Sequence, residues 1–323
     1  MTMSSQTTAP LFSVIVPVYN KKQYLGSLSA SLLKQSFRDF EVIFVDDGST
    51  DGSAEVLDTW VETRFRVITQ ANAGVSAARN TGVRAARGTY IAFLDADDWY
   101  EPEFLAEIHA LANRFPEAAL YGTAFQMVRG DRRDGSAVPA QAAYHAQTLI
   151  SDFYAAWSAG AFICASSVAV RASELKRFGL RFREGESHGE DQEMWFALAE
   201  RAPVAYSRRH LSNYLQQAAN SLSFSNRYVD ELPFVTRLAD RIAQGQTGLA
   251  NPASASLVIE RNRLESAANC GRYGEKRRAL QLLRTHLLSP NFIQLKLLVI
   301  AAIVMPTPII RTLTAVRKKF RQA

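Results

Sequence analysis

The first hundred residues alternate short apolar runs with helical patterns, and this alternation limits the fold more than any other feature. The apolar runs are rich in β-branched or aromatic residues and bounded by turn residues, as strands are: Phe12–Val18, Glu41–Val45, Phe65–Thr69 and Thr89–Leu94. Between them, apolar residues recur at spacings of three and four, as in helices: Lys21–Ser36, Ser53–Glu62 and Val75–Ala86. The alternation predicts an α/β fold with a mostly parallel central sheet flanked by helices.

Polar segments follow these strands at the points where the strands end. Tyr19–Asn20 follows the first strand, Asp46–Gly52 the second and Asp95–Asp98 the fourth. In open α/β sheets, ligands bind beyond the carboxyl ends of the strands. The sequence therefore predicts a binding site at this edge of the sheet.

The rest of the chain changes character about two thirds of the way along. We expect strands over Ala119–Val128 and Phe162–Val170, an exposed excursion over Arg129–Gln147 and a helix over Ala172–Phe178. Beyond residue 226 the pattern is mostly helical. The predicted organisation is a flexible tail over 1–10, a domain over 11–225, a helical extension over 226–290 and an apolar, basic segment over 291–323. The tail does not resemble a signal peptide.

The charge of the chain is concentrated at its end. The net charge is +6, but Lys276–Ala323 holds ten Lys or Arg residues and no Asp or Glu, which leaves about −4 for the preceding residues. A body of that charge argues against nucleic-acid binding, whereas the tail suits an anionic surface. The two cysteines, Cys164 and Cys270, make a disulfide framework or structural zinc improbable and favour a cytoplasmic location.

The C-terminal segment combines apolar and basic residues. Leu297–Met305 is uninterruptedly apolar, Pro306 and Pro308 break the run, and Arg317–Arg321 is strongly basic. A spanning helix needs about 20 mainly apolar residues. We therefore expect the segment to lie in the membrane interface, with packing against the protein's own body or true spanning as alternatives.

Three carboxylates crowd the end of the fourth strand. Asp95, Asp97 and Asp98 repel one another unless a cation or proton compensates their charge. Hard oxygen ligands suit Mg²⁺ or Mn²⁺, which often share their coordination sphere with substrate phosphates. The alternative is a solvated acidic turn before a helix that begins near Pro102.

Each of the other candidate residues, taken alone, allows both a functional and a purely structural interpretation. The Asp46–Gly52 loop has glycines that permit tight turns, and its carboxylates suit a nucleobase or ribose, but it is equally an ordinary strand–helix turn. Arg79 can fork onto phosphate or lie on the surface. Asp191 stands where a helix begins, so it is either a cap or a general base, and His188 is more simply exposed.

Taken together, Pro17–Asn20, Asp46–Gly52, Gly74–Asn80, Asp95–Asp98 and Gly189–Asp191 resemble the family 2 glycosyltransferases of GT-A fold. The resemblance runs from about Phe12 to Ser223. It implies an inverting, metal-dependent enzyme that uses Mn²⁺ or Mg²⁺ and a nucleotide-diphosphate sugar, with UDP as the expected nucleotide. The family's common work implies transfer to a glycan or lipid-linked acceptor in exopolysaccharide, capsule or lipopolysaccharide assembly.

The resemblance also implies roles for single residues. Pro17 and Tyr19 would line the nucleotide pocket, and Asp47 would read the base with Asp46 beside it. Arg79 would contact the diphosphate. Asp95, Asp97 and Asp98 match the Asp-x-Asp motif and its neighbour, with Asp95 and Asp97 toward the nucleotide and Asp97 or Asp98 as the metal ligand. Asp191 would be the catalytic base.

One segment departs from the family pattern. Many relatives carry Tyr-Arg-x-His-x-x-Ser-x-Ser late in the catalytic domain, but Leu215 and Gln217 stand here in place of the Arg and His. A cation is therefore missing, or Arg208, Arg209 or His210 supplies it. The absence of a Gln-x-x-Arg-Trp motif favours addition of a single sugar over polymer synthesis.

Three rival functions were weighed against this interpretation. A dehydrogenase would need Gly-x-Gly-x-x-Gly after the first strand, and a sugar-phosphate nucleotidyltransferase would need a Gly-rich basic loop there; the chain has neither. A catalytically degenerate transferase that acts as a sugar-binding or scaffold protein is the remaining alternative. The intact set of Asp95, Asp97, Asp98 and Asp191 argues against it.

Overall fold

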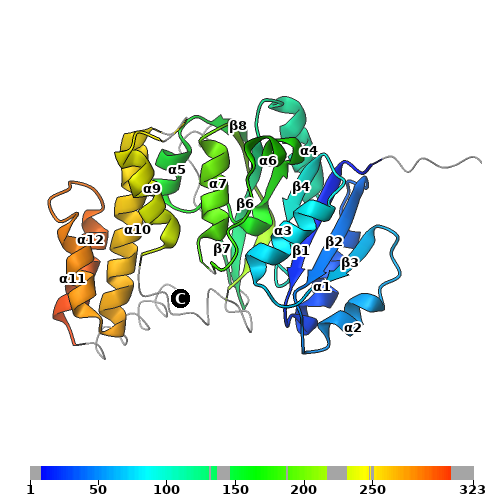
Figure 1. Cartoon of the computed structure of the whole chain (residues 1–323), viewed down its shortest axis with the longest axis horizontal. Helices are drawn as coiled ribbons and strands as arrows, with labels where there is room; N and C mark the ends of the chain where they lie inside the picture. The colour runs from blue at the N-terminus through cyan, green and yellow to red at the C-terminus, as the bar shows by residue number, and fades with distance from the viewer. Residues whose placement is uncertain are drawn as a thin grey trace, which may run out of the picture. The chain divides into compact units, whose positions relative to one another are not determined.

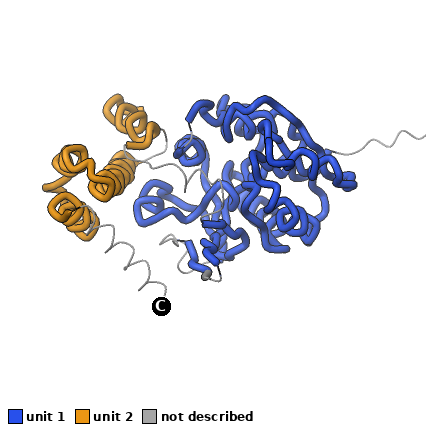
Figure 2. The backbone as a smooth tube through the Cα atoms, turned by 90° about the horizontal axis from the view of Figure 1, so that it is seen from below, with its two compact units in different colours: residues 1–222 blue, residues 223–323 orange. Residues whose placement is uncertain are grey.

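The computed structural model describes residues 9–130, 132–136, 146–186, 188–216, 231–246, 248 and 251–306. The chain divides into two compact units, residues 1–222 and 223–323 (Figure 2). The boundary expected after residue 225 lies outside the described residues. Each unit is considered by itself.

Unit 1 is built on one sheet whose first half is parallel. Strands β1 (Phe12–Val18), β2 (Phe40–Asp46), β3 (Phe65–Thr69) and β4 (Tyr90–Phe93) lie in the order β3-β2-β1-β4, all parallel (Figure 1). Buried β-branched and aromatic residues fill β1 and β2 almost completely, as expected for strands covered on both faces. The carboxyl ends of these strands share one edge.

The second half of the sheet is mixed. Strand β9 (Val168–Arg171) runs antiparallel to both β4 and β6 (Leu120–Arg129), and β10 (Val204–Leu215) runs parallel to β6. Three short strands pair antiparallel with this half: β5 (Trp99–Tyr100) and β8 (Gln147–Ile150) with β10, and β7 (Arg132–Gly135) with β6. Antiparallel β9 thus joins the parallel half to the β6–β10 pair.

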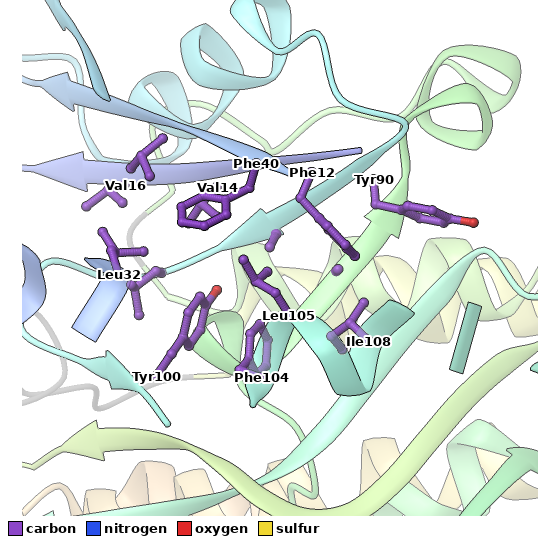
Figure 3. Packing of buried hydrophobic residues seen from close by; sticks show 14 of the residues in the cluster. Phe12, Val14, Val16, Leu32, Phe40, Tyr90, Tyr100, Phe104, Leu105 and Ile108 are labelled. Atoms are coloured by element: carbon purple, nitrogen blue, oxygen red, sulfur yellow. The ribbon is translucent and has the colours of Figure 1, made fainter. Parts of the chain in front are cut away.

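Helices cover both faces of the sheet, as its alternating side chains require. The helices of unit 1 are α1 (Lys22–Leu33), α2 (Ser53–Asp58), α3 (Val75–Ala85), α4 (Phe104–Arg114), α5 (Phe153–Ala159), α6 (Ala172–Phe178) and α7 (Glu190–Ala199). Val14 and Val16 of β1 share a buried cluster with Leu32 of α1 and with Phe104 of α4 (Figure 3). On the opposite face Ile15 lies against Gly82 of α3, where a Cβ would come within 2.2 Å of it.

Unit 2 is helical within its described residues. It contains α9 (Pro233–Ala243), α10 (Pro252–Tyr273), α11 (Lys276–Arg284) and α12 (Ile293–Val304). Its buried cluster joins α10, α11 and α12 through Leu264, Leu283 and Val299, among others. No helix in the described part of the chain has the length and apolar character that crossing a membrane requires.

One expectation about the middle of the chain was wrong in detail. The strand expected over Phe162–Val170 is shorter, because a 3₁₀ turn at Ala165–Ser167 precedes β9; the Cys164 and Ser167 side chains and backbone groups bond reciprocally across this turn. The described part of Arg129–Gln147 is largely exposed, as expected, and it also contains the paired strand β7. Residues 137–145 of that stretch lie outside the described residues.

Candidate active site

The loops that follow β1 and β2 are joined by Asn20. This residue has a positive φ of 53°, its N–H donates to Ser49 Oγ at 3.1 Å, and its Oδ1 accepts from the Thr50 N–H at 2.8 Å. Pro17 lies in β1 opposite Val45, and the Tyr19 side chain is 46% exposed. Tyr19 is therefore available to a ligand at the edge where the strand-end rule predicts one.

The two carboxylates after β2 organise neighbouring loops. Asp46 is buried and accepts from the Ser49 N–H. Asp47 is also buried, and it accepts from Gln70 Nε2 at 2.7 Å, from the Ala73 N–H at 2.9 Å and from the Gly74 N–H at 2.8 Å. A carboxylate has about four acceptor positions, so Asp47 retains capacity for one further donor.

Lys21 forms an ion pair with Asp97 of the Asp-x-Asp motif. Its Nζ lies 2.7 Å from Asp97 Oδ2, and the two side chains are 12% and 13% exposed. Burial raises the pKa of Asp97, while the Lys21 charge and hydrogen bond act against that rise. The ammonium group therefore neutralises the carboxylate that was expected to hold a metal.

Asp98 is buried, and each of its oxygens already accepts a hydrogen bond. Its Oδ2 accepts from Ser166 Oγ at 2.6 Å and its Oδ1 from the Leu215 N–H at 2.8 Å. The residue is 2% exposed, and burial, followed by the charges of Asp97 and Asp95, holds its pKa well above the ordinary value. Asp98 thus fastens the motif to the end of β10 and to the turn before β9.

Arg79 connects the motif to the helix that carries Asp191. Its Nη2 lies 2.7 Å from Asp95 Oδ1 and its Nη1 2.9 Å from Glu190 Oε1. The Arg79 side chain is 3% exposed, while that of Asp95 is 29% exposed. Because both terminal nitrogens are engaged, Arg79 fixes the distance between two site carboxylates, and its Nε has no hydrogen-bond partner among the described residues.

Asp191 lies in the first turn of α7, directly after Glu190. Gly189 is the N-cap, with φ 77°, and neither carboxylate caps the helix from that position. Asp191 Oδ1 accepts from the neighbouring Gln192 N–H at 2.7 Å. Burial, reinforced by the Glu190 charge and opposed by Arg79, raises the pKa of Asp191 to about 7. That value suits a general base at neutral pH.

The donor set fits a divalent cation at one position. Within the described part of the chain, no three His, Cys, Asp or Glu side chains form a cage for a metal ion. Mg²⁺ and Mn²⁺ sites that include substrate phosphates need only one or two carboxylates. Asp97 fits this requirement because its Oδ2 pairs with Lys21 at the partly exposed edge of the site, and the Asp95 side chain nearby is 29% exposed. Asp98 fits less well, since both of its oxygens already accept hydrogen bonds.

Three residues of the site were missed at the level of sequence: Lys21, Ser166 and Glu190. Lys21 is adjacent to the polar end of β1, and this position was a signal that went unused. Glu190 is adjacent to Asp191, but its bond to Arg79 spans 111 residues. Ser166 lies in an undistinguished turn and offered no signal. Gln217 lies outside the described residues, and Arg209 is paired with Glu107 at 2.9 Å.

The architecture corresponds to a known class of structures. Over 96% of this chain and 91% of that chain, it superposes on Staphylococcus aureus TarS residues 1–349 in complex with UDP-GlcNAc, with a TM-score of 0.69 and 21% identity. A mannosyltransferase from Pyrobaculum calidifontis in complex with GDP-Man and Mn²⁺ gives a TM-score of 0.53 at 18% identity, over 92% of this chain and 87% of that chain. The chain has the GT-A fold.

The sequence comparison agrees with the fold. Residues 13–157 match the family described as Glycosyl transferase family 2. The uncharacterized glycosyltransferase EpsJ of Bacillus subtilis is 41% identical over 126 residues, which are 38% of this chain and 36% of that relative. The chain therefore matches only about a third of that relative's length. In its N-terminal half, the chain is therefore similar to glycosyl transferase family 2.

Proposed function

We propose that this chain is an inverting glycosyltransferase that moves one sugar from a nucleoside-diphosphate sugar, with UDP as the favoured nucleotide, to an acceptor hydroxyl. The observation that carries the proposal is the Asp95–Arg79–Glu190 bridge. It ties the end of β4 to the start of α7, and so brings the proposed base, Asp191, to the Asp-x-Asp motif. TarS, which shares the fold, was crystallised with UDP-GlcNAc, and this supports a nucleotide-sugar donor.

The donor end of the proposed site is built from the loops after β1, β2 and β4. Tyr19 offers an exposed ring for the base, and Asp47 offers its remaining acceptor position to a base or ribose donor. Asp97 is the proposed ligand of Mn²⁺ or Mg²⁺, with Asp95 beside it, and a bound metal would neutralise charge on the diphosphate. Arg79 acts as a positioning residue because its side chain is only 3% exposed and bridges Asp95 and Glu190.

The proposed reaction is a single displacement. Asp191 accepts the proton of the acceptor hydroxyl while that oxygen forms a bond to the anomeric carbon. The bond between the anomeric carbon and the diphosphate oxygen breaks, and its electron pair leaves with the nucleoside diphosphate. The raised pKa of Asp191, about 7, makes it a stronger base than an ordinary aspartate once it is ionised. Attack from the opposite face inverts the configuration.

For the acceptor we propose a chemical class. A glycan or lipid-linked saccharide is the acceptor class that the family resemblance implies, in the assembly of a bacterial polysaccharide. The alternative of a degenerate, sugar-binding protein gives no role to the raised pKa of Asp191, although a partly buried carboxylate of raised pKa destabilises the fold at neutral pH. We therefore favour an active enzyme.

A donor screen with matched variants tests this function. Purified protein is incubated with UDP-, GDP- and dTDP-sugars in Mn²⁺, and release of the nucleoside diphosphate is measured. Asp191→Asn should lower turnover about 100- to 10,000-fold, yet bind the nucleotide with nearly unchanged affinity in calorimetry. Glu193→Gln, a change on the same helix that weakens the ion pair with Arg183, is the control. Unchanged turnover in Asp191→Asn would remove the base from the mechanism.

A further inference from the structure

Helix α12 buries its charged residue and exposes apolar residues, which is the reverse of a typical helix in water. Its one charged residue, Lys296, is buried: its Nζ lies 3.1 Å from Glu260 Oε1 and donates to the Ser289 carbonyl oxygen at 2.6 Å. Hydrogen bonds from Ser289, Lys296 and Asn291 outweigh the effect of burial and lower the pKa of Glu260, so the pair is ionic. The charge of α12 is thus turned inward.

The outer face of the same helix is apolar. We call four of its residues the α12 stripe: Ile293, Leu297, Ile300 and Val304, which are 63%, 60%, 39% and 74% exposed. Spacings of four, three and four residues place them on one side of the helix. Just before α12, Leu288 is 96% exposed and Leu287 49%. Single exposed apolar residues are ordinary, but a contiguous row indicates a surface that is covered in use.

The inner face of α12 already has its partners. Val299 and Ala302 are buried, and Leu298 packs against the cluster shared with α10 and α11. The Lys276 Nζ at the start of α11 donates to the Met305 carbonyl oxygen at 2.9 Å, which fixes the end of α12 beside α11. The stripe therefore cannot turn inward without breaking the packing of unit 2.

From Lys276 onward, the charged residues of unit 2 are all basic. Arg277 and Arg284 of α11 are exposed, and the sequence from residue 276 to the end contains no acidic residue. A second copy of this surface would bring like charges together, which is unfavourable. An anionic partner would instead gain from both the apolar row and the basic residues around it.

The chemistry of the stripe favours lipid over protein. Its residues are all aliphatic, whereas protein interfaces concentrate their binding energy in Trp, Tyr and Arg. Twelve residues of helix extend roughly 18 Å, too short for a hydrocarbon core of about 30 Å. We propose that α12 lies in the plane of an anionic lipid surface, with the stripe inserted among the acyl chains. This proposal does not depend on the transferase function.

Vesicle sedimentation with the full-length chain tests the proposal. The protein is mixed with vesicles of phosphatidylcholine alone or with 30% phosphatidylglycerol, at low and at physiological salt. We expect binding to the anionic vesicles that weakens with salt. The double variant Leu297→Gln/Ile300→Gln should bind at least about tenfold more weakly, and Arg277→Gln/Arg284→Gln should lose about fivefold per charge on anionic vesicles only.

Val61→Gln is the matched control, because Val61 is an isolated, fully exposed apolar residue of unit 1. It should bind vesicles like the unaltered protein, and circular dichroism and melting should show that each variant folds. Three outcomes would overturn the proposal: no vesicle binding by the unaltered protein, binding that survives loss of the stripe, or a dimer in ultracentrifugation that the stripe variant dissolves without any vesicle binding. An acidic protein partner would give the first of these.

Discussion

Asp191→Asn should stabilise unit 1 at alkaline pH while it strongly lowers turnover. Asp191 has a pKa of about 7 in the folded state against an ordinary value of 3.8. Between these values the folded state binds more protons than the unfolded state, so stability falls as pH rises through that window and stays reduced above it. At 1.36 kcal/mol per pKa unit, the ionised carboxylate costs about 4 kcal/mol above pH 7. Asn carries no charge, and its Oδ1 can accept the same bond from the Gln192 N–H.

The expected gain therefore depends on pH. It should rise from about 2 kcal/mol at pH 5 to an upper limit of about 4 kcal/mol at pH 8.5, where each kcal/mol corresponds to roughly 2–4 °C in melting temperature. All four tryptophans precede residue 223, so their fluorescence reports the unfolding of unit 1 alone. Trp195 is fully buried in the same helix as Asp191.

Asp58→Asn is the control for this experiment, since Asp58 ends α2 on the exposed surface. It should shift the melting curve little at any pH. A gain for Asp191→Asn that is the same at pH 5 and pH 8.5 would refute the argument, because the two states would then bind protons at this site equally. A loss of stability at pH 8.5 would show that the Asp191 charge is compensated in the folded state.

Three further changes probe the site and its support. Glu190→Gln should move the acid limb of the pH–rate profile to lower pH by about one unit, because the Glu190 charge raises the pKa of the base. Lys21→Met should tighten Mn²⁺ binding several-fold in the absence of nucleotide, measured by electron paramagnetic resonance, since no ammonium then competes for Asp97. Gly82→Ala should lower the melting temperature despite its better helix propensity: its Cβ would lie 2.2 Å from Ile15 Cγ2, and overpacking costs about 1–3 kcal/mol.

The parallel half of the sheet was predictable because each of its strands carries a strong local signal. β1 to β4 are short apolar runs bounded by turns, and their observed bounds lie within one residue of the expected ones. β10 was not predicted, since Ser207–His210 interrupts its apolar residues and its pairing with β6 shifts register there. A strand with such an interruption is stabilised by its neighbours, which local patterns do not report.

The sequence predicted the edge of the sheet at which the candidate site residues lie. It did not predict which of their side chains pair with one another. The strand-end rule places Asp46, Asp47 and Asp97 at one edge of the sheet, where the structure has them. The partner of each carboxylate is a tertiary property: Lys21 and Asp97 lie 76 residues apart in the chain. A pattern confined to short windows cannot relate residues at that separation.

We expect Lys21 to supply positive charge for the proposed reaction once it leaves its ion pair with Asp97. The diphosphate gains negative charge as it departs. It therefore needs a cation that can leave the carboxylate with which it is now paired. Arg79 is held by two carboxylates and is 3% exposed, whereas Lys21 is 12% exposed and Asp97 is its ion-pair partner. If Asp97 held a divalent ion, the Lys21 ammonium would lose its ion pair with that carboxylate and could approach the phosphates, as a cation in a chain where Leu215 stands in place of the Arg of many relatives. Lys21→Met should then bind metal more tightly and yet turn over more slowly, a combination that a merely structural ion pair would not produce.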